Sequence, residues 1–412
     1  MKVILRYLSR VFVGITFVFS GFVKAVDPVG GAVKFSDYFT AFGFEWLSPL
    51  SLTLSIALAA FEFTLGFYLI LNLNLRFISK LALATMSFFT VLTLGLAIFN
   101  PVTDCGCFGD AIKLTNWQTF WKNMVIMVPT LLIYVWRKEY RTPKGIFFKV
   151  TASLAPLIYI LFLAIHSYNH LPLLDFRPYK VGTNINAGIS IPEGAETPEY
   201  ETIFTLEKEG EKREFTVDEY PYDDSTWVFV DSETKVIKEG YQPPLHDFSI
   251  LDENQNDVTS DLINHKGALF LLISPKVEKI NPNQILSLSE LASKSEIENT
   301  PFYVVTSSSE EAIQKFTVEH KTFFNYLYAD DGTLKTIIRS NPGLVLLYDG
   351  TILGKWHYRD LPNKNIVDEP LANTLKDHYN KNSQALIWLH IFLLLFVTIA
   401  IINTRKTIKS TK

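Results

Sequence analysis

The chain has 412 residues, of which 48% are hydrophobic and only 19% are charged, with a formal net charge of -4. Because the apolar residues come in blocks, this composition excludes an ordinary soluble protein, and the charge balance gives no support to nucleic-acid binding. Many of the 32 Phe and 7 Trp residues lie within these blocks, which is typical of surface that faces a lipid bilayer.

Six apolar segments approach the roughly 20 residues that a helix needs to cross a hydrocarbon core about 30 Å thick. They are 11–26, 50–71, 78–99, 120–136, 146–166 and 385–402. We therefore predict a membrane protein with six transmembrane helices. A cleavable signal peptide is the alternative for the first segment, because Lys2, Arg6 and Arg10 precede it, although no small-residue cleavage site follows.

The positive residues near the ends of these segments indicate the orientation, because Lys and Arg in such positions are retained in the cytoplasm. One side of the membrane collects Lys2, Arg6, Arg10, Arg76, Lys80, Arg137, Lys138, Arg141, Lys144, Lys149, Arg405, Lys406, Lys409 and Lys412. The short loops opposite carry only Lys24, Lys34, Lys113 and Lys122. This asymmetry predicts a multi-pass protein of a bacterial inner membrane, with both termini cytoplasmic and 168–382 periplasmic.

Glu62 lies in the middle of the second predicted span, where an ionised carboxylate costs several kcal/mol unless it is paired or faces water. It has three available roles, which are protonation, pairing with Lys24 near the outer end of the first span, and a hydrogen bond to a small substrate. A paired Glu62 that only holds helices together explains the sequence equally well. A small-molecule carrier built on Glu62 is the weakest reading, since the sequence has no detectable inverted repeat.

The two cysteines of the chain, Cys105 and Cys107, lie in the predicted outer loop between the third and fourth spans. Thiols outside the cytoplasm are usually oxidised, and these two are the available pair. A disulfide between residues two apart requires a tight turn, which Gly106 and Gly109 permit. Such a bond would be strained and easily reduced, so our leading hypothesis is a redox-active pair.

Other interpretations of the cysteine pair remain open. The two thiols can be unreactive groups packed at the membrane rim, or a turn disulfide that never opens. Metal binding would need two further ligands, for which Asp104 and Asp110 are the candidates. The eight His residues are scattered and show no metal-ligand spacing.

The region after the fifth span leaves the membrane through 175–180 and is long enough for one or two cores of its own. Short β-prone runs at 203–206, 214–217, 226–230 and 236–237 predict a small antiparallel unit. Farther on, predicted strands at 268–274, 302–306, 344–348 and 351–356 surround predicted helices at 283–298 and 310–319. This alternation predicts an α/β layer fold.

A set of motifs runs through the first 140 residues. It comprises Arg10-x3-Gly14, Ser20-Gly21-x2-Lys24, Glu62-x3-Gly66, Asp104-Cys105-Gly106-Cys107-Phe108-Gly109-Asp110 and Trp117-x2-Phe120-x2-Asn123. With these residues, 1–140 resembles the DoxX-type membrane proteins, and within them the MauE branch. The resemblance implies a four-helix transmembrane core, to which 146–166 and 385–402 add two spans. It also implies work beside a thioredoxin-like protein in support of disulfide formation in another protein.

The region 241–382 resembles a periplasmic thioredoxin-like domain, with 168–240 as a linker and small β unit before it. The likeness rests on 244–252 as the opening strand, 268–274 as the central strand, and Asn341-Pro342-Gly343 as the start of the strand that follows a cis-proline. Where that family carries Cys-x-x-Cys, this chain reads Ser274-Pro275-Lys276-Val277-Glu278-Lys279. The domain therefore cannot exchange disulfides itself, and we interpret it as a binding platform.

Two functions from different classes follow. In the first, Cys105 and Cys107 exchange electrons with a periplasmic protein client, a redox partner or a quinone, while the outer domain holds the client. In the second, the chain is a non-enzymatic interaction or assembly protein anchored in the membrane. Lys335, Arg339 and Arg359 lie near Pro342 in the sequence, and we interpret them as an ordinary solvated patch.

Overall fold

The computed structural model describes residues 2–102, 104–140, 145–192, 194–196, 199–208, 210–238, 240–241, 243–245 and 248–377. The predicted sixth span, 385–402, and residues 246–247 of the predicted opening strand lie outside the described residues. The chain divides into two compact units. One contains Met1–Gly182 together with the described residues from Ser249 onward, and the other is Thr183–Phe248.

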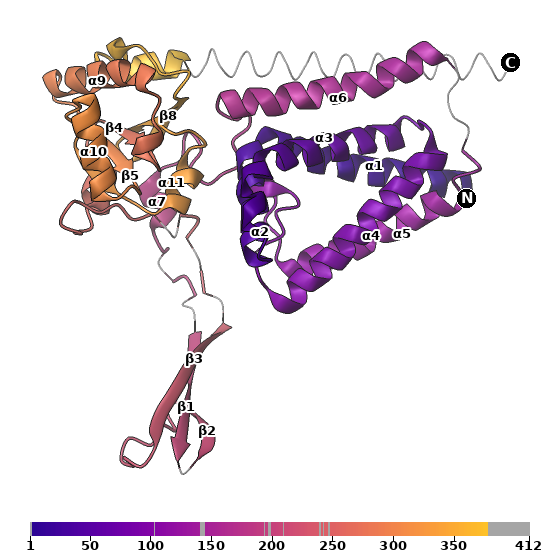
Figure 1. The fold of residues 1–412 in the computed structure, drawn as a ribbon, viewed down its shortest axis with the longest axis horizontal. Coiled ribbons are helices and arrows are strands. Elements are labelled where there is room, and N and C mark those ends of the chain that lie inside the picture. The colour runs from indigo at the N-terminus through magenta and orange to yellow at the C-terminus, as the bar shows by residue number, and fades with distance from the viewer. Residues whose placement is uncertain are drawn as a thin grey trace. The chain divides into compact units, whose positions relative to one another are not determined.

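The first unit begins with a bundle of long helices (Figure 1). They are α1 Lys2–Val26, α3 Ser51–Ile70, α4 Leu75–Phe99, α5 Asn116–Val135 and α6 Ile146–Asn169. Within the described residues, four helical stretches are long and apolar enough to cross a membrane: Lys2–Val26, Glu45–Ile70, Leu75–Phe99 and Phe148–Asn169. Helix α5 packs along α4, but polar side chains such as Lys122 and Asn123 lower the apolar character of its first turns. The protein therefore has several membrane-spanning helices, and the total of six stays a prediction.

Helices α1 and α3 touch through their glycines. A Cβ atom on Gly21 would lie 2.5 Å from the Phe63 backbone nitrogen, and one on Gly66 would lie 2.5 Å from the Gly14 carbonyl oxygen. Only residues without a side chain permit so close an approach of two backbones. This contact sets the carboxyl-terminal half of α1 beside the middle of α3.

Two helical segments that the sequence analysis did not predict connect α1 to α3. They are α2 Pro28–Ala41 and a 3-10 helix, η1, at Glu45–Leu50. Asp27 caps α2 by accepting a hydrogen bond from the Gly30 amide at 2.8 Å, and Pro28 occupies the first helical position, where proline is favoured.

A layered α/β region follows in the same unit. Its five-stranded sheet has the order β6-β5-β4-β7-β8, in which β4, β5 and β6 are parallel while β7 and β8 run antiparallel to their neighbours. The strands are β4 Ala268–Ile273, β5 Phe302–Thr306, β6 Tyr326–Tyr328, β7 Gly343–Tyr348 and β8 Thr351–His357. The helices are α8 Thr259–Ile263, α9 Pro282–Ile297, α10 Glu310–His320 and α11 Asp331–Ile337, with 3-10 turns at Val277–Lys279 and Lys364–Val367. The predicted opening strand contributes only isolated bridges from Leu251 to Asp257 and Tyr328.

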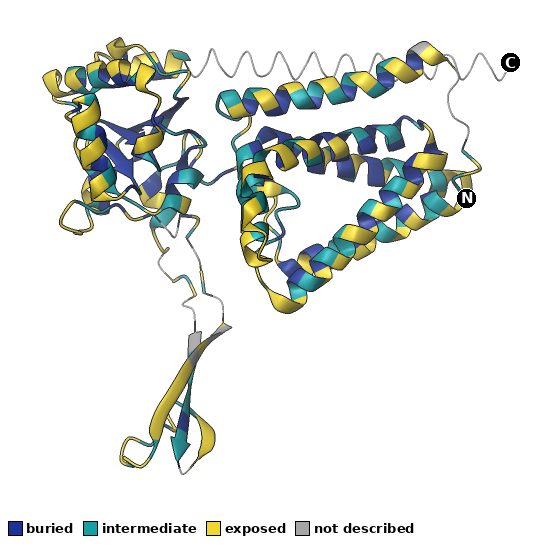
Figure 2. Ribbon diagram, in the orientation of Figure 1, coloured by how far each residue is buried: buried dark blue, intermediate teal, exposed yellow. Residues whose placement is uncertain are grey.

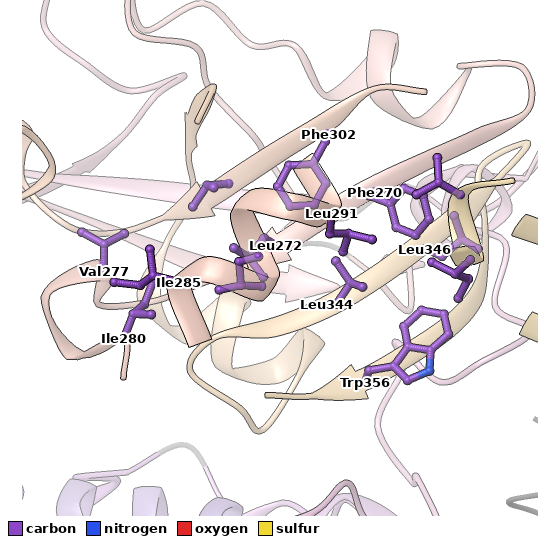
Figure 3. Packing of buried hydrophobic residues seen from close by; sticks show 14 of the residues in the cluster. Phe270, Leu272, Val277, Ile280, Ile285, Leu291, Phe302, Leu344, Leu346 and Trp356 are labelled. Atoms are coloured by element: carbon purple, nitrogen blue, oxygen red, sulfur yellow. The ribbon is translucent and has the colours of Figure 1, made fainter. Parts of the chain in front are cut away.

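The core of this region lies between the sheet and its helices. Figure 3 shows Phe270 and Leu272 of β4, Leu344 of β7, Trp356 of β8 and Leu291 of α9 converging on one another. Burial of each such side chain stabilises the fold by about 1.5–3 kcal/mol. Strand β4 is central, which explains its unbroken run of apolar residues, and it is dark along its length in Figure 2.

The second unit is a three-stranded antiparallel sheet preceded by the short helix α7, Ile185–Ile189. Its strands are β1 Glu199–Lys208, β2 Glu211–Thr216 and β3 Val228–Lys238, in the order β2-β1-β3. The predicted runs 226–230 and 236–237 thus contribute to one strand, β3. Leu206 is buried on β1, but most described side chains of this sheet are exposed or intermediate (Figure 2).

Candidate functional site

Cys105 and Cys107 lie in the segment 104–110 between α4 and α5, which we call the cysteine loop. Gly106 and Gly109 have φ angles of +65° and +50°, a conformation that favours glycine, and the Gly109 amide donates to the Gly106 carbonyl at 3.1 Å. The turn brings the two thiols together, and both are free. Cys105 is buried, whereas Cys107 keeps some exposure.

Helix α2 holds one side of the cysteine loop. The Lys34 ammonium donates to Asp104 Oδ2 at 2.9 Å, while Asp104 Oδ1 accepts a hydrogen bond from the Gly106 amide at 2.8 Å. The Tyr38 hydroxyl donates to the Cys105 carbonyl at 2.9 Å. The previously unpredicted α2 therefore fixes the backbone on both sides of the buried thiol.

Helices α1 and α3 hold the other side through a buried ion pair. Lys24 Nζ donates to Glu62 Oε2 at 2.8 Å, to Ser20 Oγ at 2.7 Å and to the Cys107 carbonyl at 2.7 Å. An ammonium has three hydrogens, so all of its donors are used. The Ser20 hydroxyl also donates to the Cys107 carbonyl, at 2.9 Å. Of the roles considered for Glu62, the structure shows pairing with Lys24.

The aromatic residue after Cys107 anchors the loop to α1 again and to a fourth helix, α5. The ring of Phe108 packs edge-on against Phe19 of α1, with 5.4 Å between ring centroids. Lys122 of α5 lies over the other side of the ring, with its ammonium 4.2 Å from the centroid, a favourable cation–π contact. This contact also brings a positive charge close to Cys107.

The two thiols are electrostatically unequal. The hydrogen bond from the Cys105 thiol lowers the pKa of Cys107, and Lys122 and Lys24 act in the same direction, whereas burial opposes them. The same hydrogen bond, together with burial, raises the pKa of Cys105. The arrangement therefore favours a single thiolate on Cys107, and the thiolate is the nucleophilic form.

The two aspartates considered as metal ligands face cations instead. Asp104 binds Lys34, and Asp110 lies 3.9 Å from the Lys113 ammonium and 3.6 Å from Arg339 Nη2. Among the described residues, no three His, Cys, Asp or Glu side chains gather in a way that suits a metal ion.

Pro342 begins the approach to β7, and the Asn341–Pro342 peptide is cis. The Asn341 side chain accepts from Ser274 Oγ at 2.9 Å and from the Lys276 amide at 3.2 Å, and donates to the Lys276 carbonyl at 2.9 Å. The loop after β4 is thus tied to the cis-proline loop by an amide side chain.

The interpretation of the cations near Pro342 as a solvated patch is wrong for Arg339. Its side chain is only 9% exposed, and its Nε lies 3.0 Å from Asp27 Oδ2. Lys335 pairs with Asp331 at the surface, and Arg359 is exposed, contacting Asn169 and Tyr358. Asp27 and Arg339 are 312 positions apart, so no spacing pattern in the sequence reveals the pair.

Two family models match parts of the chain. The one described as methylamine utilisation protein MauE matches residues 2–137, which is 136 of 412 residues, and it contains the cysteine loop. A domain of unknown function matches residues 200–239, which include the three-stranded sheet. No curated protein and no solved structure is found to match the chain. The amino-terminal third of the chain is therefore similar to the MauE family of membrane proteins.

Proposed function

We propose that this chain is a thiol-disulfide exchange protein of a bacterial cytoplasmic membrane, in which Cys105 and Cys107 are the reacting pair. The observation that carries the proposal is the pair itself, two adjacent free thiols on a turn held by four helices. Cys107 is the partly exposed thiol and has the lowered pKa, while Cys105 is buried behind it. Attack from outside therefore falls to Cys107, and Cys105 resolves the intermediate.

The exchange needs two displacement steps. The Cys107 thiolate attacks one sulfur of a client disulfide, so that a mixed disulfide forms and the other client sulfur leaves as a thiolate. Cys105, after losing its proton, attacks Cys107 and closes the Cys105–Cys107 disulfide, which releases the second client thiolate. Two electrons thereby pass to the client. In reverse, the oxidised pair takes two electrons from a client dithiol, and a partner disulfide or a membrane quinone is the class of acceptor that would reoxidise it.

The α/β region supplies the second part of the proposal. The order of β5, β4, β7 and β8, with β4 and β5 parallel and β7 antiparallel to β4, supports a thioredoxin-like fold. The loop after β4 contains no cysteine, because it reads Ser274-Pro275-Lys276-Val277. We assign this region the holding of a client or partner on the periplasmic side. The resemblance to MauE, which implies work beside a thioredoxin-like protein, supports this assignment.

Trapping of the intermediate tests the proposal. In a Cys105→Ser variant the resolving thiol is missing, so a mixed disulfide between Cys107 and a client should accumulate in cells and disappear on reduction. Cys107→Ser is the matched control and should trap little, because its remaining thiol is buried. The exchange function would be contradicted if neither variant traps a client and if the thiols of the wild type do not change state under oxidant and reductant.

A membrane-anchored interaction protein is the second candidate. The observation that favours it concerns β3, where three consecutive apolar side chains are exposed: Val228, Phe229 and Val230. Most described side chains of this three-stranded sheet are exposed or intermediate. If binding alone is the task, a Cys105→Ser, Cys107→Ser double variant should behave as wild type, whereas loss of Thr183–Phe248 should abolish function.

A further inference from the structure

Arg339 contacts one residue at the start of α2 and one residue at the end of the cysteine loop. Its Nε lies 3.0 Å from Asp27 Oδ2, and its Nη2 lies 3.6 Å from Asp110 Oδ2. Asp27 is the N-cap of α2, the helix that supplies Lys34 and Tyr38 to the loop. Asp110 is three residues beyond Cys107. One guanidinium from the α/β region therefore links the start of the clamping helix to the end of the clamped loop.

The guanidinium is itself rigidly placed. Arg339 Nη1 donates to the Lys335 carbonyl at the end of α11, at 2.6 Å. A Cβ atom added at Gly30 would lie 2.9 Å from Arg339 Nη2, so the first turn of α2 leaves room for this side chain because residue 30 is glycine. The Arg339 side chain is thus restrained by α11 and accommodated by α2, whereas the partners of an exposed ion pair move freely.

A second group of buried charges adjoins this one. Asp175 Oδ1 accepts from Arg177 Nε at 2.7 Å and Asp175 Oδ2 accepts from Lys355 Nζ at 2.8 Å, while both cationic side chains are only 2% exposed. Burial opposes the charge on Arg177, but Asp175, and beyond it Asp27 and Asp110, outweigh burial and raise its pKa. The charge of Arg339 in turn contributes to lowering the pKa of Lys355. The charge cluster, as we call it, therefore comprises three carboxylates and three cations: Asp27, Asp110, Asp175, Arg177, Arg339 and Lys355.

We propose that Arg339 is a positioning residue for the cysteine pair, which couples the state of the α/β region to the reactivity of Cys107. The inference rests on the proposed function and gives the α/β region a task besides holding a client. When Arg339 is seated between Asp27 and Asp110, α2 and the loop end are fixed and the Cys105–Cys107 hydrogen bond is maintained. When a partner draws the α/β region away, the loop relaxes and that hydrogen bond weakens.

Alkylation of Cys107 by a small maleimide, followed against pH in the purified full chain, measures this coupling. The groups that act on Cys107 are Cys105, Lys122, Lys24 and Glu62, and none of them is altered in the test variants. We expect Arg339→Gln to raise the pH midpoint of alkylation by about one unit, a tenfold change in the thiolate-to-thiol ratio. A purely structural role would lower thermal stability without moving this midpoint.

The control and partner variants sharpen the result. Arg359→Gln, an exposed arginine outside the charge cluster, should leave the midpoint where it is. Asp110→Asn should shift it in the same direction as Arg339→Gln, and the double variant should shift it no further than the larger single change, because the two residues share one interaction. Arg339→Lys keeps the positive charge but loses the planar guanidinium, which contacts two carboxylates at once. This variant should therefore shift the midpoint by a smaller amount.

Two outcomes overturn the coupling: an unchanged midpoint in folded Arg339→Gln, or additive shifts in the double variant. If Arg339→Gln does not fold, Arg339→Lys and Asp110→Asn decide the matter by the same midpoint. Maleimide requires no client, so the two proposals fail separately. Absence of any trapped client contradicts the exchange function, whereas an unmoved midpoint contradicts only the role of Arg339.

Discussion

At the scale of single residues, the site depends on a buried ion pair between Lys24 and Glu62. Lys24 and Glu62 have side chains that are 11% and 4% exposed, so each needs the other as a counter-ion. Their third partner, the Cys107 carbonyl, makes the pair part of the cysteine loop rather than a separate carrier site. The sequence identified both residues, but it left open whether they meet.

The ion pair yields a stability prediction. Glu62→Gln leaves the Lys24 ammonium buried without a counter-ion, so the variant should lose about 3 kcal/mol or more of unfolding free energy. Thermal unfolding in lipid nanodiscs measures this loss. Glu45→Gln, at an exposed glutamate, is the control and should behave as wild type. A Lys24→Met, Glu62→Leu double variant should recover much of the stability but not the reactivity of Cys107, and an equally stable Glu62→Gln would refute the argument.

At the scale of elements, the segment between α6 and the sheet does more than connect them. The sequence predicts that 175–180 is a linker leaving the membrane, yet Arg177 and Tyr179 are 2% and 3% exposed. Lys355 of β8 donates to the Tyr179 carbonyl at 2.9 Å. Burial alone would raise the pKa of Asp175, but Arg177 and Lys355 outweigh it and lower the pKa to about 2. The segment is thus anchored to β8 by buried charges.

Lys355 gives this anchor a pH dependence. Burial lowers the pKa of Lys355 to about 7 in the folded protein, against a usual value of 10.5. Between these values the unfolded chain binds more protons, so stability should rise with pH by at most about 1.4 kcal/mol per unit. Lys355→Met should flatten this rise in a series of melting temperatures from pH 7 to pH 10. Lys364→Met, on the surface, should retain it, and an identical slope in all three proteins would contradict the lowered pKa of Lys355.

How far the elements could be predicted depended on local signals. Helices α3, α4 and α6 have long apolar runs and were predicted within a few residues, whereas α1 begins earlier than predicted, at Lys2. Lys2 and Arg6 form ion pairs with Glu139, so these charged residues before the apolar run are part of the helix. Helix α2 was missed because Gly30 and Gly31, which disfavour a helix interior, weaken the helical pattern of its first turn. Strand β6 was missed because three residues carry too little pattern.

At the scale of the whole molecule, the part of the site that escaped prediction is long-range. The cysteine pair stood out in the sequence, and its neighbours Lys24 and Glu62 were named. Arg339 was interpreted as a surface cation, since a charge near a proline carries no sign of a partner more than 300 positions away. Burial and pairing of distant charges are decided by tertiary packing, for which sequence periodicity has no signal.

The proposed topology is tested by placing single cysteines in a Cys105→Ser, Cys107→Ser background. Lys315→Cys, on the exposed side of α10, should react in intact cells with a maleimide that cannot cross the membrane, as the proposed periplasmic location of the α/β region requires. Lys138→Cys, in the turn after α5, should react only after the cells are opened. Labelling with the opposite pattern would invert the orientation.

The ion pair between Lys24 and Glu62 also determines how this part of the site responds to a voltage across the membrane. A transmembrane voltage does work on a residue in proportion to its charge, about 2.3 kcal/mol per elementary charge for every 100 mV. Lys24 and Glu62 are joined at 2.8 Å and sum to zero, so the field has no net charge to move beneath the cysteine loop. The pair itself should therefore respond little to a change in membrane voltage, and Lys24 should keep its hydrogen bond to the Cys107 carbonyl in energised and de-energised membranes alike.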